Sequence, residues 1–149
     1  MTENPLRRLL VVDDESEILA EVAGYLRRRG EPVVTASSYR QGLQALEDDA
    51  VPIDILITDG RMPDGSGIDL LRAAIERPGG PHAFILMTGH FEESDLTADL
   101  VEAGVVVMHK PFSLSALYRQ VGAVWDTHCP IVPALEPAPA SPMATATGS

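Results

Sequence analysis

The sequence predicts an α/β protein built as a doubly wound, five-stranded parallel sheet with five helices. Five short apolar segments of strand character occur along the chain, and a helical segment follows each of them. Strands that are separated by single helices require right-handed parallel crossovers, which place helices on both faces of one sheet. Hydrophobic residues make up 45% of the 149 residues, enough to build the core that such a sheet needs.

The first half of the chain contains three predicted strands and two predicted helices. An unbroken aliphatic run at 8–12 is typical of a strand buried on both faces. The helix predicted at 15–30 gathers its apolar residues on one face and stops at a glycine. A β-branched run gives the strand at 32–36, a serine cap begins the helix at 38–48, and a further apolar run gives the strand at 53–58.

The second half repeats the alternation. The helix predicted at 66–76 starts with a serine followed by an acid three residues later, the capping-box spacing. Apolar runs predict strands at 82–88 and 105–109, on either side of a shorter helix at 93–104 that ends in glycine. The last helix, at 113–125, carries apolar residues at helical spacing on one face.

Composition excludes several classes of protein. The 22 acidic residues outnumber 11 Lys and Arg, and the formal charge of −11 argues against direct nucleic-acid binding by this chain. A single cysteine, Cys129, cannot form an internal disulfide, and the four dispersed histidines do not have zinc-ligand spacing. No apolar run approaches the ~18 residues of a membrane span, and the N-terminus lacks a signal-peptide pattern. We therefore expect a cytoplasmic protein that does not enter a membrane.

The domain boundary is predicted from a change in composition near the C-terminus. Residues 5–127 form one predicted module. Residues 128–149 are rich in proline and alanine, which predicts a disordered tail or a linker. The chain is thus either a stand-alone module or a part that continues into an effector.

Chemically distinctive residues follow the predicted strands. Asp13 and Asp14 follow the first strand, Asp59 the third, Thr88 the fourth and Lys110 the fifth. Functional groups of an open parallel sheet gather at the carboxyl ends of its strands. Three neighbouring carboxylates repel one another and stay ionised only beside a cation, for which Mg²⁺ with its preference for oxygen ligands is suited.

Each of these residues also has a purely structural interpretation. Asp14 could cap the first helix, with Glu17 completing a capping box. Asp59 could be a solvated turn residue, and Lys110 a surface lysine. Their joint placement at successive strand ends, rather than any single residue, favours a site.

Four segments carry a resemblance to a known family: "VVDDE", "LITDGRMPDGSG", "ILMTGH" and "HKPF". With these segments the sequence resembles the receiver domain of two-component response regulators, the CheY-like family. The resemblance implies a flavodoxin-like sheet with strand order 2-1-3-4-5.

The resemblance also implies a role for each matched residue. Asp59 would be the phosphoacceptor. Asp14 and Asp59 would bind Mg²⁺ directly, Asp13 mostly through water, and Arg61 through its backbone carbonyl.

Two further matched residues would act on the phosphoryl group. Lys110 would pair with a phosphoryl oxygen, Thr88 would donate its hydroxyl to the transferred group, and the bond before Pro111 would be cis, as in the family.

The implied function is that of a switch rather than an enzyme. The phosphodonor would be a sensor histidine kinase or a phosphotransfer protein, and the chain would assist its own phosphorylation and dephosphorylation. Phosphorylation would change the binding of a downstream effector that the sequence does not identify, and homodimerisation is compatible with such a module.

One departure from the family supports a second hypothesis. Receivers usually carry Tyr or Phe three residues before the lysine, whereas this chain has Val107. The alternative is a phosphorylation-independent protein-interaction module that keeps the receiver fold. An aspartate-nucleophile phosphohydrolase is disfavoured, because neither acidic segment has the D-x-D pattern of that class.

Overall fold

A five-stranded, all-parallel sheet forms the centre of the molecule. The computed structural model describes residues 7–89 and 96–128. The sheet order is β2-β1-β3-β6-β7. Its strands are β1 (Leu9–Val12), β2 (Val33–Ala36), β3 (Ile55–Asp59), β6 (Ala83–Thr88) and β7 (Val106–His109). Counting only these strands along the chain, the order is 2-1-3-4-5, which confirms the predicted fold class.

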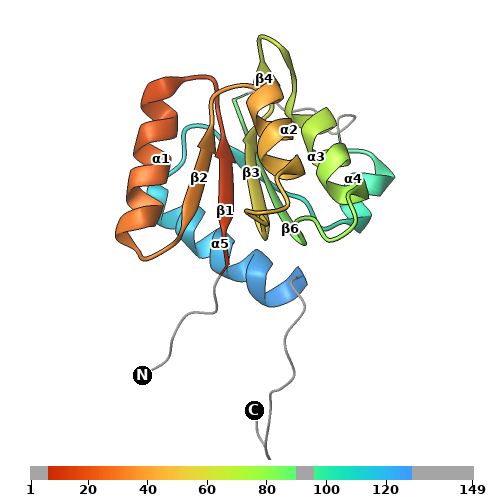
Figure 1. Ribbon diagram of the computed structural model, residues 1–149. Helices are drawn as coiled ribbons and strands as arrows, with labels where there is room; N and C mark the ends of the chain where they lie inside the picture. The colour runs from red at the N-terminus through yellow and green to blue at the C-terminus, as the bar shows by residue number, and fades with distance from the viewer. Residues whose placement is uncertain (1–6, 90–95, 129–149) are drawn as a thin grey trace, which may run out of the picture.

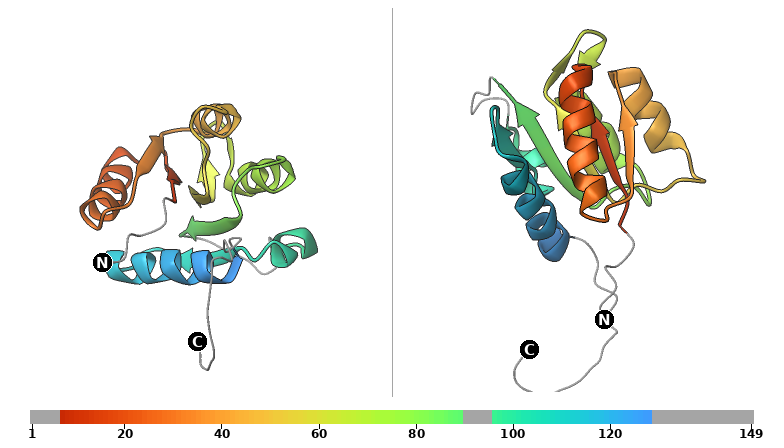
Figure 2. Two further views of the ribbon diagram at one scale, coloured as in Figure 1. Left: turned by 60° about the horizontal axis from the view of Figure 1, so that its bottom comes forward. Right: turned by 90° about the vertical axis from the view of Figure 1, so that its left-hand side faces the viewer.

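Helices cover both faces of the sheet, as Figures 1 and 2 show. One face is covered by α1 and α5, and the other by α2, α3 and α4. Their bounds are α1 (Ser16–Arg28), α2 (Tyr39–Glu47), α3 (Gly67–Glu76), α4 (Ala98–Glu102) and α5 (Leu114–His128). Among the described residues, no helix is long and apolar enough to cross a membrane.

The core consists of two apolar clusters, one on each face of the sheet. Successive residues of β1 alternate between them: Leu9 and Val11 face α1 and α5, while Leu10 and Val12 face α2 and α3. All four are completely buried. Burial on both faces explains why the strands have continuous apolar sequences, because every residue needs an apolar side chain.

Three details differ from the sequence-based expectation. A short antiparallel hairpin, β4 (Arg61–Met62) with β5 (Gly65–Ser66), was not predicted. Of the helix predicted at 93–104, the described part is helical only over α4, and residues 90–95 lie outside the description. The last helix continues to His128, and residues 129–149 of the predicted tail also lie outside the description.

The strand register brings the predicted site residues to one edge. Val12 is level with Thr58, so Asp13 and Asp59 follow at adjacent positions on neighbouring strands. Thr88 is level with His109 on the other side of β3, immediately before Lys110. The parallel register thus places all these residues at the carboxyl end of the sheet.

A buried ion pair closes the opposite end of the sheet. Arg7 donates two hydrogen bonds to the Glu31 carboxylate, from Nε at 2.9 Å and Nη2 at 2.6 Å. The two side chains are only 10% and 2% exposed. The guanidinium also lies 5.7 Å from the ring centroid of Trp125 on α5. The pair therefore joins the start of β1, the loop after α1 and the last helix.

Glu31→Ala should lower the free energy of unfolding by about 3 kcal/mol, because it leaves the Arg7 charge buried without a partner. Urea unfolding followed by circular dichroism measures the change. Asp49→Ala is the matched control: it breaks an ion pair with Arg77 in which the Asp49 side chain is 95% exposed. The control should cost less than about 1 kcal/mol. Equal losses in the two variants would contradict the assigned role of the buried pair.

Candidate phosphoacceptor and metal site

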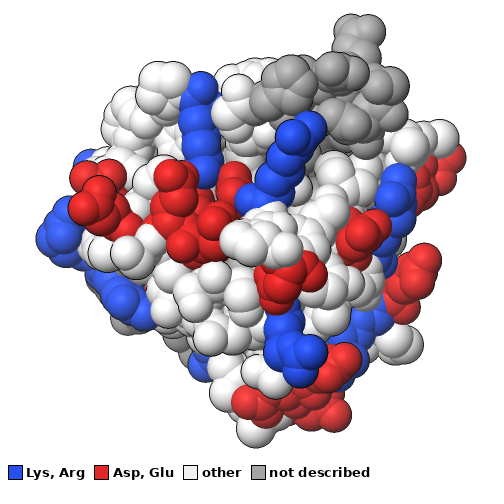
Figure 3. Space-filling model, turned by 90° about the horizontal axis from the view of Figure 1, so that it is seen from above, with Lys and Arg blue, Asp and Glu red and all other residues white. Residues whose placement is uncertain are grey.

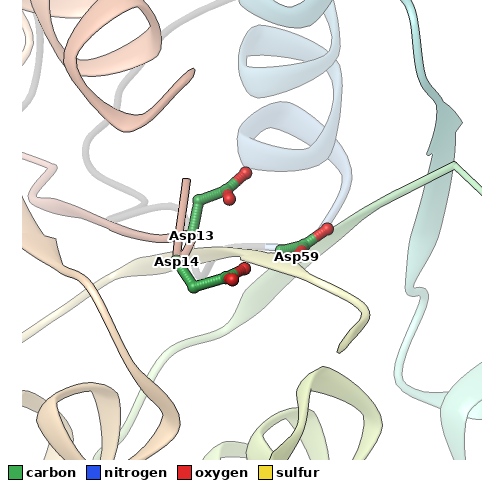
Figure 4. A group of neighbouring side chains, drawn as sticks. All are labelled: Asp13, Asp14 and Asp59. Atoms are coloured by element: carbon green, nitrogen blue, oxygen red, sulfur yellow. The ribbon is translucent and has the colours of Figure 1, made fainter. Parts of the chain in front are cut away.

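Three carboxylates converge at the carboxyl edge of the sheet. Asp13 and Asp14 follow β1 and Asp59 ends β3, and Figure 4 shows their side chains close together at this edge. Each offers a carboxylate oxygen, and these oxygens lie within 4.8 Å of one another. Asp13 is fully buried, Asp59 is 8% exposed, and Asp14 is exposed. The cluster therefore runs from the protein interior to the solvent.

Asp14 is not the cap of the first helix, so that structural interpretation was wrong. The residue before α1 is Glu15, whose side chain makes no capping hydrogen bond. The turn is held by Asp13 instead, whose Oδ1 accepts the Glu15 N–H at 2.9 Å. The Asp14 carboxylate is thus not used in starting the helix and lines a pocket together with Asp59 and Lys110.

Lys110 lies among the carboxylates and is their main source of positive charge. Its Nζ donates to Asp13 Oδ2 at 3.1 Å and to Asp59 Oδ1 at 3.0 Å, and lies 3.7 Å from Glu15 Oε1. Burial lowers the pKa of Lys110, but the hydrogen bonds to Asp59 and Asp13 outweigh it, so the pKa is raised above 10.5. Lys110 is therefore held as a cation. The peptide bond to Pro111 is cis, as the resemblance implies.

Asp59 carries a carboxylate whose charge is not fully compensated. Burial raises its pKa above 3.8, and the negative charge of Asp13 adds to this rise, although the hydrogen bond from Lys110 opposes it. The hydrogen bond from Lys110 thus does not offset the cost of burying the Asp59 charge beside Asp13. A divalent cation bound by these oxygens would supply the missing positive charge.

The donor set fits Mg²⁺ or a similar hard cation. All three side chains offer carboxylate oxygens, and Asp14 at the exposed side leaves room for the waters that Mg²⁺ retains. Softer metals that prefer sulfur or imidazole would find no such ligand in this cluster of three carboxylates.

A pocket of about 390 Å³ opens over the cluster. It is lined by Asp14, Glu15, Asp59, Arg61, Thr88, Gly89 and Lys110. Figure 3 shows this end of the molecule, where acidic side chains gather with basic side chains beside them. The pocket thus combines a carboxylate that could act as a nucleophile with a cation and a hydroxyl.

Thr88 and Arg61 both line the pocket. Thr88 ends β6 and is 6% exposed, and its carbonyl accepts the Lys110 N–H at 2.7 Å. Arg61 is exposed and begins β4, two residues after Asp59. All six predicted site residues therefore lie at one edge. Glu15, which was not predicted as a site residue, joins them as the third acid of the segment that starts with Asp13.

The backbone beyond Asp59 approaches itself too closely for side chains. A Cβ on Gly67 would lie 1.9 Å from the carbonyl oxygen of Asp59. The Gly67 N–H instead donates to the Gly60 carbonyl at 2.9 Å, which closes the segment between them into a tight loop. Glycine at position 67 thus allows the chain to return beside the site.

Val107 lies on β7, level with Leu86 of β6. It is half-buried and packs against the cluster beneath α2, α3 and α4. The position at which the family usually has an aromatic side chain is therefore filled by a small aliphatic one.

Comparison with known proteins agrees with this arrangement. Residues 9–122 match the family model described as the response regulator receiver domain. The response regulator SaeR of Staphylococcus aureus is 31% identical over 116 residues, which cover 78% of this chain and 49% of that protein. The chain thus spans about half the length of the curated relatives it matches.

Solved structures agree as well. A response regulator receiver domain protein from Clostridium thermocellum superposes with a TM-score of 0.71 at 32% identity, covering 82% of this chain and 96% of that one. A CheY-like receiver domain protein from Methanospirillum hungatei gives a TM-score of 0.72 at 27% identity, covering 83% and 96%.

The uncompensated charge of Asp59 predicts a pH dependence of stability. Without divalent cations, Asp59→Asn should have a higher free energy of unfolding than the wild type at pH 7. Because the folded-state pKa of Asp59 lies above 3.8, the Asp59 carboxyl group binds a proton more tightly in the folded protein than in the unfolded chain. The difference in the free energy of unfolding between Asp59→Asn and the wild type should therefore be small below pH 3.8. It should grow as the pH rises through the raised pKa of Asp59 and reach its full size above that pKa.

Urea unfolding in the presence of a chelator, repeated from pH 3 to pH 7, measures this difference. An Asp59→Asn variant that is less stable than the wild type at pH 7 would show that Lys110 fully compensates the charge.

Proposed function

Because the chain belongs to the family of response regulator receiver domains, we propose that Asp59 accepts a phosphoryl group from a phosphohistidine. The donor is a sensor histidine kinase or a phosphotransfer protein of a two-component system. The observation that carries the proposal is the position of Asp59. Its carboxylate lines the pocket, 3.0 Å from Lys110 Nζ and beside two further acids.

The reaction transfers one phosphoryl group between two protein side chains. An Asp59 carboxylate oxygen attacks phosphorus, the phosphorus–nitrogen bond of the phosphohistidine breaks, and its electron pair returns to the imidazole, which takes up a proton. Such a transfer needs alignment and charge neutralisation more than covalent chemistry from the protein. The rigid end of β3 provides the alignment, since all five of its residues are buried.

Lys110 and Thr88 serve the transferred group in this proposal. The ammonium of Lys110, which lies 3.0 Å from Asp59, is placed to pair with a phosphoryl oxygen as a compact charge. Thr88 lines the same pocket and donates its hydroxyl to the group after transfer.

Mg²⁺ is the cofactor in this proposal. Asp14, Asp59 and the backbone carbonyl of Arg61 would hold it, with Asp13 beside them. When bound, it would supply positive charge to the phosphoryl oxygens. The compact donor set and the raised pKa of Asp59 support this assignment.

The proposed protein is a signalling switch, located in the cytoplasm, that assists its own phosphorylation and dephosphorylation without being an enzyme in the usual sense. Residues 5–127 form the receiver domain, and residues 128–149 are a tail or a linker. Phosphorylation changes binding to a downstream effector. Direct nucleic-acid binding by this chain does not fit its charge of −11, and homodimerisation remains compatible with the fold.

Val107 supports a second candidate, an interaction module that does not switch on phosphorylation. Its small side chain is half-buried and packs against the apolar cluster beneath α2, α3 and α4. In that case the acidic pocket would accept phosphate without changing α4 and β7.

Incubation with acetyl phosphate and Mg²⁺ should add the mass of one phosphoryl group to the intact protein. Asp59→Asn should abolish the addition, because the amide is not a nucleophile for phosphorus. Asp48→Asn is the matched control, as Asp48 is an exposed aspartate beyond the end of α2 and lies outside the pocket. Intact-mass spectrometry measures the product.

Phosphate added to the Asp59→Asn variant would refute the proposal. Phosphorylation of the wild type that leaves the amide spectra of α4 and β7 unchanged would favour the second candidate over the switch.

A further inference from the structure

The hairpin that follows Asp59 is fixed at its base. The Gly67 N–H donates to the Gly60 carbonyl at 2.9 Å, and between these residues Arg61 pairs with Ser66 in the β4–β5 ladder. Arg61 also lines the acidic pocket. The hairpin therefore forms one wall of the pocket. Buried Met62 anchors its first strand in the apolar core, whereas Asp64 at its tip is exposed.

The tip of the hairpin is tied to the start of α2 by Asp64. Oδ1 of Asp64 accepts the Tyr39 N–H at 2.9 Å, and Oδ2 accepts the Arg40 N–H at 3.0 Å. The first N–H groups of a helix have no partner within the helix, and the positive end of the helix dipole favours a carboxylate there. The hydrogen bond from the Arg40 N–H, followed by that from Tyr39, lowers the pKa of Asp64 below 3.8. The Asp64 carboxylate that links the hairpin to α2 is therefore ionised at neutral pH.

A steric contact reinforces the tie. A Cβ on Gly65 would lie 2.5 Å from Cγ of Tyr39, so the hairpin backbone packs directly on the Tyr39 side chain. The helix does not depend on Asp64 alone for its start, because Ser38 Oγ accepts the Gln41 N–H at 3.1 Å. Ser38 thus caps α2 from within, whereas Asp64 links α2 to the wall of the pocket.

We propose that Asp64 is a positioning residue for the cation site: it holds the hairpin tip on α2 and thereby fixes the backbone of Arg61 beside Asp59. The inference rests on the proposed function, in which the acidic cluster binds Mg²⁺ and the Arg61 carbonyl contributes an oxygen. Without the two hydrogen bonds of Asp64, the exposed tip gains conformational freedom. The free energy of ordering it again when the cation binds reduces the affinity.

Asp64→Ala should weaken Mg²⁺ binding about tenfold, a typical effect of losing a residue that supports a metal site from outside its ligand shell. Isothermal titration calorimetry of the wild type and the variant, without a phosphodonor, measures the dissociation constant. With acetyl phosphate, the variant should need more Mg²⁺ for half-maximal phosphorylation, while the rate at saturating Mg²⁺ should change little.

Three further variants separate positioning from other effects. Ser38→Ala weakens the start of α2 but leaves the tie intact, so Mg²⁺ affinity should be close to that of the wild type. Asp64→Asn keeps one acceptor oxygen and should lie between wild type and Asp64→Ala. Gly65→Ala pushes the tip away from Tyr39 and should weaken Mg²⁺ binding with Asp64 still present.

The inference is overturned if Asp64→Ala binds Mg²⁺ as the wild type does, or if Ser38→Ala causes the same loss. It is also overturned if Asp64→Asn and Asp64→Ala weaken Mg²⁺ binding equally and the loss of affinity vanishes in high salt. The lost negative charge alone would then explain the weaker binding. If the wild type binds no Mg²⁺, the proposed cation site fails together with this inference.

Discussion

Electrostatic crowding at the carboxyl edge of the sheet is the constraint on which the site depends. Three carboxylates whose oxygens lie within 4.8 Å of one another are held by the ends of two neighbouring strands. Asp13 is completely buried, so bulk water does not solvate its carboxylate. Lys110 offsets part of this charge, but burial and the negative charge of Asp13 still raise the pKa of Asp59, so its ionised form is disfavoured. The fold thus maintains a pocket that is suited to a divalent cation and an anionic phosphoryl group together.

The rest of the molecule holds this unfavourable arrangement in place. The two apolar clusters bury both faces of β1 and β3, which fixes the strand ends relative to each other. Lys110 comes from the other side of β3, beyond the end of β7, and its backbone N–H is bound by the Thr88 carbonyl. The carboxylates and their cation are therefore placed by separate elements whose register is set by the core.

The sequence was sufficient to predict the elements with strong patterns. Continuous apolar strands and amphipathic helices are encoded locally, and the parallel order then forces Asp13, Asp14, Asp59 and Lys110 to one edge. The β4–β5 hairpin was missed, because strands of two residues have no periodicity to detect. The tie from Asp64 was missed because its partners lie 25 and 24 residues earlier, and no local pattern marks such a contact.

The most direct test of the acidic pocket as a single cation site is an NMR titration with Mn²⁺, whose unpaired electrons broaden nearby amide signals. One equivalent should broaden the signals of residues around Asp13, Asp59 and Lys110 and leave those near Trp125, at the far end of α5, sharp. Competition by Mg²⁺ should restore the lost signals. Broadening spread over the acidic surface in proportion to exposure, with no preferred position at the end of β3, would contradict the account.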